Sequence, residues 1–155
     1  MYSRGLYDKD DIIHINPRNY YINVKLRDDD YEFCENDDKF NYYNTKSGRL
    51  VIHNYKTGGI YDEYDVYVTT YVMKVIEKSI ELKPREYLIE KDDGGLYSNN
   101  ALSERVTKVL NHNINTIRKA IESYEINVKN TSRECLAHVS RHSVSTQEMC
   151  YLSRN

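Results

Sequence analysis

The side chains best suited to chemistry lie near the C-terminal end of the chain, in the segment from Leu136 to Tyr151. Tyr151 follows His142 by nine residues, and Arg118 precedes His142 by 24 residues. A tyrosine hydroxyl can act as a nucleophile. An arginine guanidinium presents forked, permanently charged donors to phosphate oxygens. These residue types would together suit transesterification at a phosphodiester.

Common catalytic and cofactor motifs are missing from the sequence, which contains no GxxxxGK[ST], GxGxxG, HExxH or GxSxG. The three cysteines, Cys34, Cys135 and Cys150, form no CxxC pair. Their odd number and wide spacing indicate neither a zinc site nor a disulfide framework, and they favour a reducing compartment. We therefore expect no metal and no cofactor.

The segment 136–151, LAHVSRHSVSTQEMCY, resembles the last motif of the tyrosine recombinases, also called the phage-integrase family. That motif reads roughly L-[AG]-H-S-x-x-[ST]-T-Q-x-Y, and its nucleophilic tyrosine stands nine positions after the histidine, as Tyr151 does after His142. A lone match of this kind is a weak signal. The assignment depends on the family's other residues appearing at matching separations.

Three further segments match. The family's H-x-x-R box corresponds to 115–118, NTIR, which ends at Arg118. Arg18 lies 100 residues earlier, in NPRNYY, and resembles the P-x-R-x-x-[DEY] box of recombinase-like proteins from large DNA viruses. Lys56, in NYKTGG between two expected strands, corresponds to the family's hairpin lysine. The resemblance therefore runs from about Pro17 to Tyr151.

The resemblance implies a role for each residue. Tyr151 would attack the phosphorus, and the 5′ oxygen would leave, giving a 3′-phosphotyrosyl link. Arg18 and Arg118 would clamp the charge that builds on the nonbridging oxygens. Lys56 would protonate the leaving oxygen, and His142 would donate a hydrogen bond to the phosphate.

The sequence departs from the family pattern at several positions. Asn115 stands where the second box has a histidine, a hydrogen-bonding partner in the family, so a slower enzyme is expected. Tyr21 replaces the acid that commonly braces the first arginine, and Arg141 replaces a glycine before His142. Four basic residues are expected to contact DNA: Arg105, Lys108, Lys119 and Arg141.

Taken singly, each residue has a simpler interpretation. With 16 tyrosines in the chain, Tyr151 alone would be structural; Lys56 would be a solvated turn lysine, Arg18 a surface arginine and Asn115 a helix N-cap. His138 and Arg141 also offer a rival second-arginine box, H-x-x-R-H. That choice leaves no tyrosine motif before the chain stops, so Arg118 is preferred.

The elements that must position these residues divide into two halves. Segments 20–26, 40–45, 49–55 and 66–69 are rich in β-formers, and Gly48 and 57–59 predict turns of an antiparallel meander. Apolar stripes over 72–80, 102–110 and 114–124 have helical spacing, and Pro84 ends the first. Capping boxes at 131–134 and 145–148 predict two more helices. We expect an α+β fold, a small antiparallel three-stranded sheet followed by a helical bundle.

Composition excludes other classes. A mean hydropathy of -0.79 and no long apolar run exclude a membrane-spanning helix, and the N-terminus has no apolar signal-peptide region. The net charge of -2 divides unevenly. From Ser98 onward there are 8 basic and 5 acidic residues, which gives +3 there and -5 before it. Two acidic clusters, 28–30 and 35–38, are interpreted as solvated loops.

We expect residues 1–155 to be one catalytic domain, because 17 residues before Arg18 and four after Tyr151 leave no room for an N-terminal DNA-binding domain or a C-terminal docking helix. The expected function is a site-specific recombinase or integrase acting on double-stranded DNA, as a tetramer on paired sites. The expected location is intracellular, in a host nucleus or viral factory if the chain is viral.

One alternative is a catalytically silent, truncated descendant that only binds DNA or a partner protein. An unrelated tyrosine-rich structural protein remains only if the spacings are chance.

Overall fold

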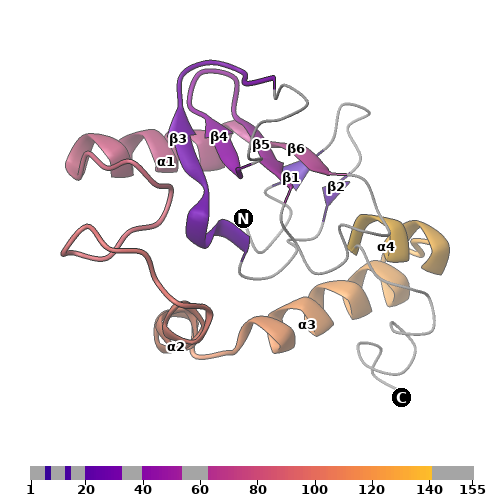
Figure 1. Ribbon diagram of the computed structural model, residues 1–155. Helices are drawn as coiled ribbons and strands as arrows, with labels where there is room; N and C mark the ends of the chain where they lie inside the picture. The colour runs from indigo at the N-terminus through magenta and orange to yellow at the C-terminus, as the bar shows by residue number, and fades with distance from the viewer. Residues whose placement is uncertain (1–5, 8–12, 15–19, 33–39, 54–62, 141–155) are drawn as a thin grey trace.

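The computed structural model describes residues 6–7, 13–14, 20–32, 40–53 and 63–140, and in these ranges a β-sheet is followed by four α-helices (Figure 1). The expected α+β order is therefore confirmed. The strands are β1 (Leu6–Tyr7), β2 (Ile13–His14), β3 (Lys25–Arg27), β4 (Tyr42–Asn44), β5 (Arg49–Ile52) and β6 (Tyr64–Val68). The helices are α1 (Thr70–Leu82), α2 (Asn99–Leu110), α3 (Ile114–Asn127) and α4 (Arg133–Ser140).

The sheet is larger than expected and is not purely antiparallel. Its strand order is β2-β1-β6-β5-β4-β3, and only the β3–β4 pair is parallel. Four of the strands, β3 to β6, have three or more residues and form a mixed sheet, which β1 and β2 extend at one edge. The expectation of three antiparallel strands is therefore wrong. The 14 residues between Arg27 and Tyr42 are long enough for the crossover that a parallel pair needs.

The predicted strand over 20–26 is also corrected. Tyr20–Asn23 forms a 3₁₀ turn, labelled η1, and β3 begins only at Lys25. Tyr21 and Val24 are both buried. Residues three apart lie on one side of a 3₁₀ turn, whereas a strand would send them to opposite faces. Burial of both side chains therefore favours the turn over the strand preference of the residue types.

The main core lies between the sheet and α1. On β6 every second residue is buried, namely Tyr64, Val66 and Val68, which is the period of a strand with one covered face. Ile76 of α1 is buried in the same cluster, and Figure 1 shows α1 lying against the sheet. The core is unusually rich in tyrosine. Its fully buried tyrosines are Tyr21, Tyr42, Tyr43 and Tyr64.

The turn between β4 and β5 forms where Gly48 predicts it. Gly48 has φ +73°, a conformation that a side chain disfavours. Its N–H donates to the Asn44 carbonyl at 2.9 Å, and its carbonyl accepts from Val68 N–H at 2.9 Å. The Asn44 side-chain oxygen accepts from the backbone N–H groups of Lys46 and Ser47. The turn therefore ties β4, β5 and β6 together.

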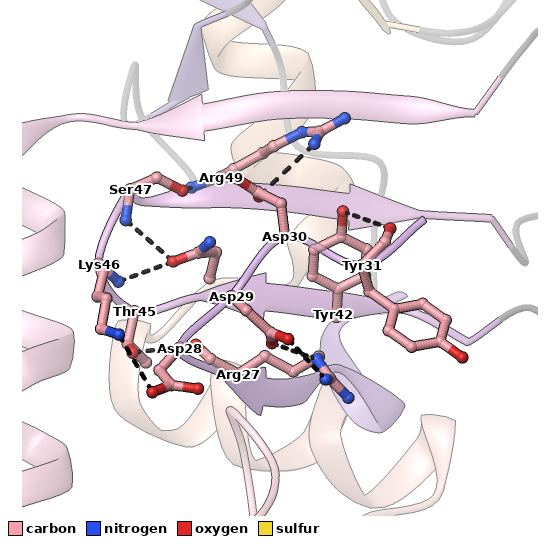
Figure 2. A network of polar contacts seen from close by, with 11 residues as sticks. Arg27, Asp28, Asp29, Asp30, Tyr31, Tyr42, Thr45, Lys46, Ser47 and Arg49 are labelled. Atoms are coloured by element: carbon pink, nitrogen blue, oxygen red, sulfur yellow. Dashed lines mark hydrogen bonds and ion pairs between the residues drawn. The ribbon is translucent and has the colours of Figure 1, made fainter. Parts of the chain in front are cut away.

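The acidic segment at 28–30 is exposed to solvent, as expected for a solvated loop, and its carboxylates also pair with bases of the sheet and its turns (Figure 2). Asp28 lies 3.2 Å from Lys46, Asp29 lies 2.8 Å from Arg27, and Asp30 lies 3.5 Å from Arg49. The Arg27 hydrogen bond holds the pKa of the Asp29 carboxyl below its ordinary value. The second acidic cluster, 35–38, lies outside the described residues.

All four helices begin close to where the sequence predicts them. Side-chain oxygens of Ser98, Asn113 and Ser132 accept N–H groups in the first turns of α2, α3 and α4. The N-cap of α3 is thus Asn113, so the interpretation of Asn115 as an N-cap is wrong. The helix expected after the 145–148 capping box lies outside the described residues. None of the described helices is both long and apolar enough to cross a membrane.

Candidate active site around Arg118

Arg118 is the one arginine of the predicted pair that the structure describes, and it is buried in a defined environment. It lies on α3 with only 2% of its surface exposed. One terminal guanidinium nitrogen donates to the Ser140 carbonyl oxygen at 3.2 Å. The same nitrogen lies 3.7 Å from Oε1 of Glu122, whose side chain is 0% exposed. The guanidinium is thus held from two different helices.

Local sequence explains the contact with Glu122. Glu122 follows Arg118 by four residues, so the two side chains share one face of α3. Ser140 is the last described residue of α4, and its carbonyl oxygen accepts from the guanidinium. Arg118 therefore contacts a carboxylate on its own helix and the backbone of α4.

A small apolar cluster holds α3 and α4 against each other. Leu136 of α4 is buried, and Ile121 and Ile126 of α3 pack against it. Because Leu136 and Ser140 are four residues apart, they lie on the same face of α4. The packing of Leu136 therefore brings the end of α4 toward α3, where Arg118 reaches it.

Several described elements adjoin the other predicted residues in the sequence. Helix α4, which ends two residues before His142, contacts both α3 and β2, and Figure 1 shows α4 close to β2. Strand β2 ends four residues before Arg18. Lys56 lies in the connection between β5 and β6, which pair antiparallel with Ile52 opposite Tyr64. Four of the predicted catalytic residues themselves lie outside the described residues: Arg18, Lys56, His142 and Tyr151.

Asn115, the remaining predicted catalytic residue, is described and differs from Arg118 in its setting. It is the second residue of α3 and is exposed to solvent. Thr116 N–H donates to the side chain of Asn113, so the capping of this helix does not use Asn115. An exposed amide in the first turn of α3 remains able to contact a ligand.

The predicted DNA-contacting residues are exposed wherever the structure describes them. Arg105 and Lys108 lie on α2, and Lys119 lies on α3 beside Arg118 in the sequence. Successive helical residues point about 100° apart, which is consistent with Lys119 facing solvent while Arg118 is buried. Arg141 lies outside the described residues.

Two side-chain pairs were missed by sequence reasoning, Arg118–Glu122 and His53–Glu63. Glu122 had a signal, since an acid four residues after an arginine in a helix is a common ion pair. The second pair joins Nδ1 of His53 to Glu63 at 3.1 Å. These residues immediately flank the 54–62 segment that contains Lys56, and Asn41 accepts the His53 backbone N–H at 2.9 Å. His53 and Glu63 are ten residues apart and follow no local pattern. They meet because β5 and β6 pair with Ile52 opposite Tyr64.

Within the described ranges, no group of three or more His, Cys, Asp or Glu side chains is arranged to hold a metal ion. Several of the described acids pair with bases, as in the Asp28–Asp30 segment and at Glu122.

Comparison with known proteins gives a likeness in structure rather than in sequence. No family model matches the chain, and no curated protein matches it. Among solved structures, the crystal structure of XerA recombinase matches with a TM-score of 0.60 and 11% sequence identity. The match covers 88% of this chain and 46% of XerA, so the chain spans less than half the length of that protein. Over most of its length, the chain has a fold similar to that of XerA recombinase.

Proposed function

We propose that this chain acts on double-stranded DNA by recombinase-type strand transfer, through a covalent phosphotyrosyl intermediate at Tyr151. The observation that supports it most is the arrangement of Arg118, which is anchored against the end of α4 in a fold similar to that of a recombinase. The predicted histidine and nucleophile follow α4 in the sequence. Arg118 contacts Ser140, and His142 and Tyr151 follow Ser140 in the sequence by two and eleven residues.

The proposed reaction balances without an added reactant. The Tyr151 oxygen bonds to phosphorus and gives its proton to solvent water, while the bond from phosphorus to the 5′ oxygen breaks. Lys56 supplies the proton that this oxygen takes up, and the lysine regains a proton from solvent. Arg18 and Arg118 stabilise the charge on the nonbridging oxygens, and such preorganised donors are worth about 3 kcal/mol each. His142 and Asn115 would provide further hydrogen bonds.

The burial of Arg118 sets a condition on this mechanism. At 2% exposure, its guanidinium is covered, so a phosphate contact requires access to it when DNA binds. Both contacts described above use one terminal nitrogen of the guanidinium.

The test is a suicide DNA substrate with a nick beside the cleavage site, which traps the covalent intermediate. The wild-type chain should give a protein–DNA adduct that survives denaturing electrophoresis, and Tyr151→Phe should give none because the attacking oxygen is missing. Tyr71→Phe is the matched control, since Tyr71 is 77% exposed on α1, and it should cleave as the wild type does.

Other outcomes would contradict the proposal in distinct ways. An equal adduct from wild type and Tyr151→Phe would remove Tyr151 as the nucleophile. Salt-sensitive DNA binding with no adduct, even at high protein concentration, would point to the silent descendant. No DNA binding at all would remove the recombinase-type function itself.

A further inference from the structure

We propose that Glu122 is a positioning residue for Arg118: it fixes the guanidinium at the end of α4, where the proposed reaction needs it. The inference rests on the proposed function and extends it to a residue that lies outside the recombinase motifs matched in the sequence. Glu122 acts on the reaction through Arg118 and does not itself touch the DNA.

The burial of Glu122 is the first argument. Its side chain is 0% exposed, and a buried carboxylate is strongly unfavourable unless it is paired. Arg118, itself 2% exposed, lies 3.7 Å from it. Ion pairs of this kind seldom add stability over apolar residues of the same size. A charged pair in this place is therefore better explained by a requirement for the guanidinium than by stability.

The geometry supplies the second argument. An unrestrained arginine samples many rotamers, and ordering it at the moment of reaction would be costly. Here the carboxylate of Glu122 and the carbonyl of Ser140 approach the same guanidinium nitrogen from α3 and α4. Contacts from two elements restrict the direction of the side chain before any DNA is present. Donors that are already in place need no reorganisation in the transition state.

The position of Ser140 gives the third argument. Ser140 is buried and ends α4, two residues before His142 in the sequence. By holding Arg118 on the Ser140 carbonyl, Glu122 also fixes the distance between α3 and Ser140, the residue from which the chain continues to His142 and Tyr151. A change at Glu122 should therefore alter the rate of reaction more than the binding of DNA.

The test compares Glu122→Gln with Glu104→Gln, an exposed glutamate on α2 that serves as the matched control. Glutamine keeps the shape of Glu122 but lacks its charge, so the variant should fold. With the nicked substrate at saturating DNA, Glu122→Gln should slow adduct formation by about tenfold or more, because a small misplacement of a catalytic group costs up to about a hundredfold. DNA affinity should stay unchanged, and Glu104→Gln should match the wild type in both.

Two results would overturn the inference. One is an adduct rate for Glu122→Gln equal to that of the wild type. The other is a slower rate that follows only a lower folded fraction, measured on the same samples by circular dichroism. Either would leave Glu122 a structural residue.

A second measurement decides the point even if the wild type never cleaves DNA. The Nε–H signal of Arg118 in nuclear magnetic resonance should exchange slowly with solvent in the wild type and in Glu104→Gln. In Glu122→Gln it should exchange at least about tenfold faster, since a freed guanidinium samples solvent. Unchanged exchange would refute the positioning role. Absence of an adduct from every variant would refute the proposed function instead.

Discussion

At the scale of single residues, two buried polar groups differ in whether they have a partner. Arg118 is buried with a carboxylate and a carbonyl in contact with its guanidinium. Tyr43 on β4 is also buried, yet its hydroxyl has no hydrogen-bond partner within the described part of the chain. A polar group buried without a partner costs about 1–3 kcal/mol. Removal of the Tyr43 hydroxyl should therefore increase the stability of the protein, whereas most substitutions at buried positions decrease it.

Tyr43→Phe is expected to stabilise the protein by about 1 kcal/mol at neutral pH, because it removes an unsatisfied hydroxyl without leaving a large cavity. Urea unfolding followed by circular dichroism measures the change. The matched control is Tyr42→Phe on the same strand. The Tyr42 hydroxyl donates to the Tyr31 carbonyl at 3.4 Å, so its loss should be neutral or destabilising. A Tyr43→Phe variant less stable than Tyr42→Phe would contradict this account.

The same residue gives a pH dependence. Burial raises the pKa of Tyr43 to about 12, from its ordinary value of 10.0. The folded state therefore holds this proton more tightly than the unfolded state does. Below pH 10 both states keep the proton, so the free energy of unfolding does not depend on this group. As the pH rises from 10 toward 12, the unfolded state loses the proton first, and the free energy of unfolding falls. Unfolding measured across this range should show a steeper loss of stability in the wild type than in Tyr43→Phe.

At the scale of elements, the β4–β5 turn depends on a glycine for two separate reasons. Gly48 has φ +73°, and a Cβ there would lie 3.3 Å from Sδ of Met73 and 3.4 Å from a methyl carbon of Val68. The positive φ would put strain on the backbone of any other residue. The two short distances mean that its side chain would also crowd Met73 of α1 and Val68 of β6. Gly94 has φ +82° but nothing within 4 Å of such a Cβ. The two glycines therefore separate the two effects.

Gly48→Ala is expected to lower the free energy of unfolding by about 1–2 kcal/mol from backbone strain, with a further loss from crowding. Gly94→Ala should show the strain alone and so a smaller loss. Both are measured by urea unfolding at neutral pH. Equal losses would mean that Met73 moves aside without cost, and a larger loss at Gly94 would contradict the packing described for the turn.

At the scale of the whole molecule, charge is divided between the two halves. The first 97 residues carry -5 and the rest +3. Part of the negative charge is locally compensated, because Asp28, Asp29 and Asp30 pair with bases of the sheet and its turns (Figure 2). The negative charge that could weaken the attraction of a polyanion to the exposed bases on α2 and α3 is therefore smaller than the net charge of -2 suggests. This distribution is compatible with binding to a polyanion.

The double variant Arg105→Gln/Lys108→Gln should weaken DNA binding and reduce the slope of log affinity against log salt concentration by about one to two, since each lost phosphate contact removes about one released counterion. Fluorescence anisotropy of a labelled duplex over a range of salt concentrations measures it. The control with the same charge change is Lys74→Gln/Lys78→Gln, on the exposed face of α1. An equal effect from the control would mean that DNA does not use α2.

Much of this architecture follows from the sequence alone, because it depends on local patterns. Helical spacing of apolar residues, the capping serine Ser132 in the predicted box at 131–134 and the glycine turn at Gly48 act over a few residues, and each lies where the sequence indicates. The pairing of Arg118 with Glu122 was also readable in principle, since four residues separate them on one helix.

Other features required the tertiary structure. The direction of β3 against β4 depends on a crossover, and strand composition is the same for either direction. The turn at Tyr20–Asn23 forms because Tyr21 and Val24 are buried together, which outweighs their strand preference. The contact of Arg118 with Ser140 joins residues 22 apart. The chain alone thus determined which residue types could act on a phosphate, whereas the packing of α3 on α4 decided where Arg118 is held, since only packing brings distant residues into contact.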